Sequence, residues 1–122
     1  MAQLRTGLLL KTNGSIEEVT LDMSEHTNNI GILLNDKLTF LGQLNREPEK
    51  INAVIIYGKN SQLKNLEINQ CKLPEPFNEE IVYGDIFIIC MDENSEPQNF
   101  TKDDLEEYIK NYETLYKNNY YD

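Results

Sequence analysis

Carboxylates are the side chains of this chain whose type and spacing suggest a site for chemistry. Asp92, Glu93 and Glu96 lie close together, and Asp85 precedes Asp92 by seven positions. Carboxylate oxygens are the ligands that Ca²⁺ and Mg²⁺ prefer, so these four residues are candidate metal ligands of a small metal-dependent hydrolase. The alternating ligands and sixth-position glycine of a calcium loop are missing, as is a nearby Glu-x-Lys element. The competing interpretation is a solvated acidic loop.

Other catalytic patterns are missing from the sequence. His26 is the single histidine, and the surrounding stretch SEHTNN has no motif that would orient it for a Ser–His or Cys–His pair. Cys71 and Cys90 are nineteen positions apart, which indicates neither a disulfide framework nor a zinc site. The isolated glycines form no phosphate-binding loop. Apart from the four carboxylates, we therefore predict no catalytic residue and no cofactor.

The negative charge is concentrated in the C-terminal part of the chain. Residues 1–72 contain eight acidic and eight basic residues, whereas residues 73–122 contain thirteen acidic residues and three lysines, which accounts for the whole net charge of −10. Phosphate contacts require clustered lysines and arginines, and anionic membranes attract basic segments. We therefore expect neither direct nucleic-acid binding nor membrane binding. An acidic surface suits a basic protein partner, and solubility alone is the alternative explanation.

The elements that would position these residues include a well-specified C-terminal helix over residues 101–117. Thr101 is the expected N-cap, and Asp104 stands at the third helical position of a capping box. Phe100 has the hydrophobic-staple spacing to the first of a series of apolar residues that recur every three or four positions: Leu105, Tyr108, Ile109, Tyr112, Leu115 and Tyr116. We expect this side to pack on a sheet, and residues 118–122 to form a frayed tail.

The C-terminal helix and tail also contain the candidate residues for partner binding. Asp103, Glu106 and Glu107 are in the first turns, where the helix dipole favours anions. Tyr120 and Tyr121 are two aromatic residues near the end of the chain that could dock a partner. A homo-oligomer remains an alternative to a different protein partner.

The remaining elements are mostly strands. Asn13-Gly14 predicts the turn of a hairpin over residues 4–22. Residues 24–34 predict a short helix with Ser24 as its N-cap, and residues 38–41 a brief strand ending at Gly42. Residues 51–57 are a β-branched strand, and residues 81–91 are the most apolar run and the expected central strand.

Together these elements predict one α+β domain over residues 1–117. Its sheet is mixed or mostly antiparallel, with four to six strands, and the C-terminal helix packs on one face. The expected core residues are Ile86, Ile88, Val54, Ile56, Leu105, Ile109 and Tyr112. The segment LPEPF at residues 73–77 is extended by its prolines, and it either straps the domain's own core or anchors in a partner's groove.

Three segments carry a resemblance to a known family: LTFLGQ at 38–43, LPEPF at 73–77, and GDIFIICMDENSEPQNFT at 84–101. In order and content they resemble a family of uncharacterised small proteins encoded by large nucleocytoplasmic DNA viruses of algae and amoebae, over roughly residues 30–110. This resemblance implies no established activity and no catalytic residues. It implies a viral protein that acts in an infected eukaryotic cell or in the virion.

The leading functional hypothesis is a non-enzymatic viral interaction module, virion-associated or host-directed, whose acidic half faces a basic partner. The N-terminal apolar stretch is too short for a signal peptide, and the longest apolar run is below the ~18 residues of a membrane span. We expect a location in the host-cell cytoplasm or nucleus, or in the virion, and no secretion.

Overall fold

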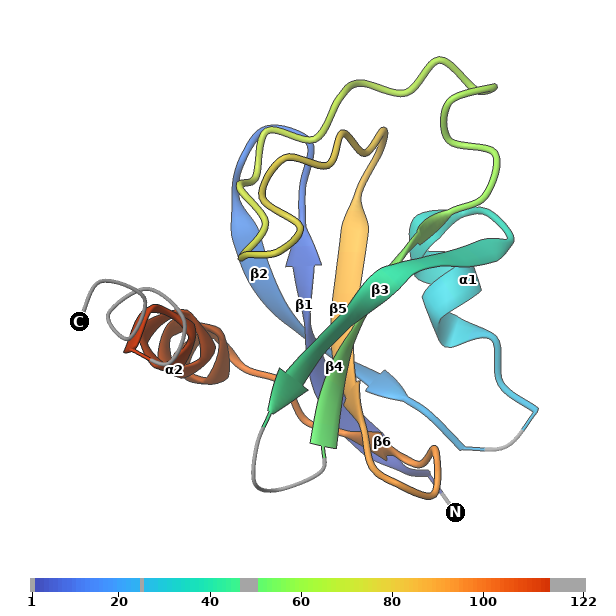
Figure 1. Cartoon of the computed structure of the whole chain (residues 1–122). Helices are drawn as coiled ribbons and strands as arrows, with labels where there is room; N and C mark the ends of the chain where they lie inside the picture. Colours follow the sequence, from blue (N-terminus) through green and yellow to red (C-terminus); the bar gives the residue numbers. More distant parts are fainter. Residues whose placement is uncertain (1, 25, 47–50, 115–122) are drawn as a thin grey trace.

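The computed structural model describes residues 2–24, 26–46 and 51–114, and these form an α+β fold (Figure 1). In chain order the elements are β1 (Leu4–Leu10), β2 (Ile16–Asp22), α1 (Asn29–Leu34), β3 (Leu38–Arg46), β4 (Ile51–Gly58), β5 (Ile86–Met91), β6 (Pro97–Gln98) and α2 (Lys102–Tyr112). The proposed tail at 118–122 lies outside the described residues.

In the part of the chain that the structure describes, six strands form one sheet in which every pairing is antiparallel. The strand order is β2-β1-β5-β4-β3, and the short β6 pairs with the end of β5. β5 lies between β1 and β4, and its residues from Ile86 to Cys90 are all buried. The prediction of a central strand is therefore confirmed, although this strand begins at Ile86 instead of residue 81.

The predicted N-terminal hairpin over residues 4–22 is confirmed, and the structure adds its register. β1 and β2 pair in register from Leu4 opposite Asp22 to Leu10 opposite Ile16. Gly14 in the connecting turn has a φ of 94°, a conformation that glycine adopts without steric cost. The Asn13-Gly14 pair therefore sets the turn and, with it, which side chains of β1 face the core.

Two elements differ from the sequence-based prediction. The short helix begins at Asn29, five positions after the expected cap Ser24, and ends at Asn35 in the left-handed conformation with a φ of 53°. β3 continues through Gly42 to Arg46, because a bulge between Phe40 and Gly42 shifts the register without ending the pairing with β4. Gly42 therefore marks a bulge within β3 and not the end of the strand.

Both faces of the sheet are covered. On one face a buried cluster includes Leu9, Phe87 and Ile89, and the side chains of α1 pack against it. On the opposite face a larger cluster includes Leu8, Ile88, Cys90 and Phe100, together with residues of the 59–85 connection, which is the green and yellow segment of Figure 1. A strand buried on both faces must be apolar throughout, which explains the continuous run IFIIC in β5.

The expected packing of the C-terminal helix across the sheet is not confirmed. None of the residues of α2 is buried, and Ile109 is 39% exposed. Leu105 and Tyr108 are partly buried against the larger cluster, whereas Tyr112 is only half-buried. The strand residues Ile86, Ile88 and Ile56 are buried as predicted, and Val54 is partly buried. The apolar stripe of α2 instead faces a connecting segment, as described below.

Candidate functional site

The start of α2 is held in place by a capping box and by an anchored residue before it. The Asp104 backbone N–H donates to Thr101 Oγ1 at 3.3 Å, and the Thr101 N–H donates to Asp104 Oδ2 at 2.8 Å. Phe100 is fully buried, and its N–H donates to the carbonyl oxygen of Thr6 in β1 at 2.8 Å. The predicted cap is confirmed, and it fixes where the acidic side of the helix begins.

The three acidic candidates on α2 are all exposed. Asp103, Glu106 and Glu107 are spaced at positions i, i+3 and i+4, so they share one side of the helix. Leu105 and Tyr108, which contact the core cluster, lie on the opposite side. The structure therefore brings the three carboxylates together on a solvent-facing surface, which we call the acidic face; the exposed Lys110, four positions after Glu106, lies on the same side.

A fourth carboxylate reaches α2 from a distant part of the chain. The backbone N–H of Lys102 donates to Glu18 Oε2 at 2.9 Å, and the neighbouring residue Glu17 is also exposed on β2. A carboxylate at a helix N-terminus accepts an otherwise unpaired N–H and interacts favourably with the helix dipole. Glu18 therefore extends the acidic surface beyond the C-terminal part of the chain. No local pattern could have revealed this contact, because 84 positions separate the two residues.

The segment 72–78, which we call the strap, connects α2 to the sheet. Leu73 and Pro74 are buried, and the ring of Phe77 lies against Gly42 of β3. The structure thus favours the strap interpretation of LPEPF over the free anchor. On its outer side, the Tyr108 hydroxyl donates to the carbonyl oxygen of Glu75 at 3.1 Å. The helix is therefore docked on the strap, and the strap is docked on the sheet.

A groove runs between the strap and α2. Its cavity of about 200 Å³ is lined by Lys72, Leu73, Pro74, Glu75, Asn78, Tyr108, Ile109, Tyr112 and Glu113. The rings of Tyr108 and Tyr112 have centroids 6.0 Å apart and are tilted by 37° to each other. This groove combines apolar and aromatic side chains with a few polar ones, as ligand sites do.

The structure does not bring the metal-ligand candidates together. Asp85 precedes β5 and Asp92 follows it, so the seven residue steps between them span about 23 Å, at about 3.3 Å per residue. Asp92 Oδ1 accepts the backbone N–H groups of Asn94 and Glu96, both at 2.9 Å, and Oδ2 accepts from Gln98 Nε2 at 3.1 Å. Within residues 2–24, 26–46 and 51–114, no group of three or more His, Cys, Asp or Glu side chains is placed to hold a metal ion.

The carboxylate of Asp92 therefore shapes the turn between β5 and β6. The hydrogen bond from the Glu96 N–H lowers the pKa of Asp92 most; burial opposes it by a smaller amount, and the hydrogen bonds from Asn94 and Gln98 add still smaller downward effects. Glu93 and Glu96 are exposed in the same turn. These hydrogen bonds favour the charged form of the Asp92 carboxylate, and they stabilise the tight connection into α2.

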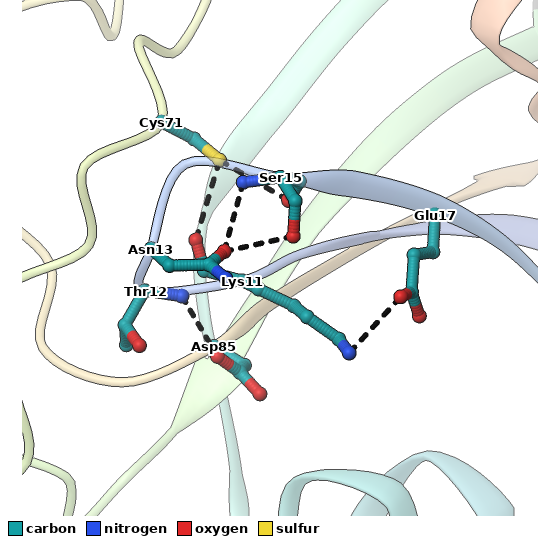
Figure 2. Close-up of polar contacts among 7 residues, drawn as sticks. All are labelled: Lys11, Thr12, Asn13, Ser15, Glu17, Cys71 and Asp85. Carbon is teal, nitrogen blue, oxygen red and sulfur yellow. Dashed lines mark hydrogen bonds and ion pairs between the residues drawn. The ribbon is translucent and has the colours of Figure 1, made fainter.

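Asp85 has a comparable structural role at the other end of β5. Figure 2 shows its carboxylate beside the β1–β2 turn, where Oδ1 accepts the Thr12 N–H at 3.0 Å. In the same view the Cys71 thiol points at the turn and donates to the carbonyl oxygen of Lys11 at 3.4 Å. Burial, and then the charge of Asp85, raise the pKa of Cys71, so its thiol stays protonated at neutral pH. These contacts join the 59–85 connection to the hairpin.

The remaining candidates are the two C-terminal tyrosines and the histidine. Tyr120 and Tyr121 lie outside the described residues. His26 is exposed, with a φ of 68°. No helix in the described part of the chain is long and apolar enough to cross a membrane.

A family model described as a family of unknown function (DUF5880) matches residues 8–108. The matched range includes β5, the Asp92 turn and the first part of α2, and it ends at Tyr108. No curated protein and no solved structure matches the chain.

Proposed function

The chain belongs to this family of unknown function (DUF5880), and we propose that it is a non-enzymatic protein-interaction module whose acidic C-terminal half binds a basic protein partner. The observation that carries this proposal is the exposure of Asp103, Glu106 and Glu107 on one side of a helix whose start is fixed by a capping box. A rigid helix presents charges without the entropic cost of ordering a loop on binding.

The charge distribution supports a protein partner in preference to other classes. The net charge of −10 would repel the phosphates of nucleic acids and of anionic membranes. Complementary charge raises the rate at which a basic protein associates. Glu18, whose carboxylate accepts the Lys102 N–H, adds to the negative potential beside the N-terminal turn of α2. A second copy of the chain is a weaker candidate, because like net charges repel.

We further propose a viral origin, based on the resemblance of the three segments to proteins of large DNA viruses. The module then acts in the cytoplasm or nucleus of the infected eukaryotic cell, or in the virion. The alternative of a metal-dependent hydrolase receives no support from the positions of Asp85 and Asp92, which lie at opposite ends of β5.

Quantitative affinity capture from infected cells tests this function with two variants of equal charge change. The first is Asp103→Asn/Glu106→Gln/Glu107→Gln, which neutralises the acidic face. The matched control is Glu67→Gln/Glu79→Gln/Glu93→Gln, which neutralises three exposed carboxylates outside α2.

Each exposed charge contributes about 0.2–1 kcal/mol to a contact, so the acidic-face variant should bind its partner about 3- to 150-fold more weakly. The control variant should retain most of the binding, with equal melting temperatures confirming that both variants are folded. Equal losses of partner affinity in the two variants would show that only net charge matters. That result would overturn the assignment of the binding surface to α2.

A further inference from the structure

The groove between the strap and α2 combines three features that suit one kind of side chain. Its floor is apolar and aromatic, formed by Pro74, Tyr108, Ile109 and Tyr112. Ile109 is 39% exposed, although it belongs to the apolar stripe of the helix. The cavity volume of about 200 Å³ is sufficient for one long side chain and too small for a packed helix.

The charges of the groove come from both of its walls. Glu75 is on the strap and Glu113 is on the helix, so carboxylates flank the aromatic floor from two separate segments. Among the described residues that line the groove, Lys72 is the one basic side chain, beside two carboxylates. A cation with an apolar stem therefore matches this groove better than an anion or a purely apolar side chain.

We propose that this groove binds an arginine side chain from an extended segment of the basic partner. The inference rests on the proposed function, since it names the part of the partner that the acidic half recognises. The methylene stem of the arginine packs on Ile109 and Pro74. The guanidinium stacks on the tyrosine pair and forms hydrogen bonds with the carboxylate of Glu113.

Arginine is favoured over lysine for physical reasons. Its guanidinium is planar, so it stacks on aromatic rings and pairs with carboxylates in a bidentate geometry, whereas an ammonium group does neither. It is also less strongly hydrated, which lowers the cost of entering a half-apolar groove. A cation over a tyrosine ring gains further electrostatic attraction. The acidic face, one to two turns earlier on α2, would then attract additional basic residues of the same segment.

The test is an NMR titration of the full ¹⁵N-labelled chain with a peptide probe. The probe is the acetylated, amidated peptide Ser-Arg-Leu-Ser-Arg. Its control replaces both arginines with citrulline, which keeps the shape of the side chain and removes its charge. The protein variants are Glu113→Gln for the groove and Asp103→Asn/Glu106→Gln/Glu107→Gln for the acidic face. Both change exposed residues, so folding should be preserved.

The arginine peptide should shift the backbone amides of residues 73–78 and 108–113, and the citrulline peptide should not. Glu113→Gln should raise the Kd of the arginine peptide about 1.4- to 5-fold, the effect of losing one favourable charge pair. Equal shifts with both peptides, or no shifts at any peptide concentration, would overturn the inference.

Two further outcomes distinguish this inference from the proposed function. If the arginine peptide changes the chemical shifts of Asp103, Glu106 and Glu107 alone, the groove assignment is overturned and the acidic-face function stays in place. Groove resonances that move on dilution without any peptide would show that a second copy of the chain occupies the groove, which would overturn the assignment to a partner's arginine.

Discussion

Replacing Thr101 by alanine tests whether the capping box sets the stability of α2. In the variant the Asp104 N–H loses its side-chain acceptor at 3.3 Å, and the hydrogen bond between Thr101 Oγ1 and Asp104 Oδ2 at 3.0 Å is also lost. The bond from the Thr101 N–H to Asp104 Oδ2 does not involve the hydroxyl and remains. Because only part of the box is lost, we expect a destabilisation of about 1 kcal/mol, the middle of the range for caps.

The natural control for this change is Thr114→Ala in the same chain. The Thr114 hydroxyl donates to the carbonyl oxygen of Lys110, four positions earlier, at 3.0 Å. Such back-bonding does not stabilise a helix, so this variant should change stability by less than about 0.5 kcal/mol. Thr101→Ser keeps the capping oxygen and should also remain close to the original protein.

Urea denaturation and amide hydrogen exchange measure the two effects. Thr101→Ala should lower the midpoint without changing the slope with denaturant, and the amides of Leu105 to Ile109 should exchange about fivefold faster, the factor that corresponds to about 1 kcal/mol. If Thr101→Ala and Thr114→Ala are equally stable, the capping box does not determine the position of α2, and the reasoning from it to the acidic face fails.

Three further predictions concern the core, the close contact at β3 and the Asp92 turn. Phe100→Ala should destabilise the protein by about 3–5 kcal/mol, because a fully buried ring is removed; a loss below about 1 kcal/mol in urea denaturation would contradict its anchoring role. Gly42→Ala should cost about 1–3 kcal/mol, because a Cβ would lie 2.4 Å from the ring of Phe77; adding Phe77→Leu should recover part of that loss, and simple additivity would argue against the contact. The lowered pKa of Asp92 means that its contribution to stability is present above the ordinary carboxyl pKa of about 3.9 and is lost as the pH falls through the lower pKa of the folded protein; Asp92→Asn should make acid unfolding less steep, and an unchanged pH profile would contradict this.

Local sequence patterns correctly predicted the elements whose structure depends on residues close to one another in the chain. The Asn13-Gly14 turn and the Thr101–Asp104 box each involve residues at most three positions apart, and both are present as expected. The central position of β5 followed from its continuous apolar run, since only a strand covered on both faces has that composition.

Contacts between distant segments could not be predicted in this way. The pairing of the Lys102 N–H with Glu18 joins residues 84 positions apart. Gly42 suggested the end of a strand, but the close approach of Phe77 requires a glycine within β3. Similarly, the apolar stripe of α2 predicted burial on a sheet, whereas Tyr108 packs beside the strap and leaves Ile109 partly exposed.

The most direct test of the central claim is the salt dependence of partner binding. The tagged chain is purified from infected cells, the bound proteins are identified by mass spectrometry, and the Kd of the captured partner is measured at low and at high ionic strength. Exposed charges more than about 8 Å apart are largely screened at 0.15 M salt, so the account predicts a basic partner whose affinity falls steeply as salt is added. A partner that binds equally well at both ionic strengths would contradict the claim that the acidic face makes the contact.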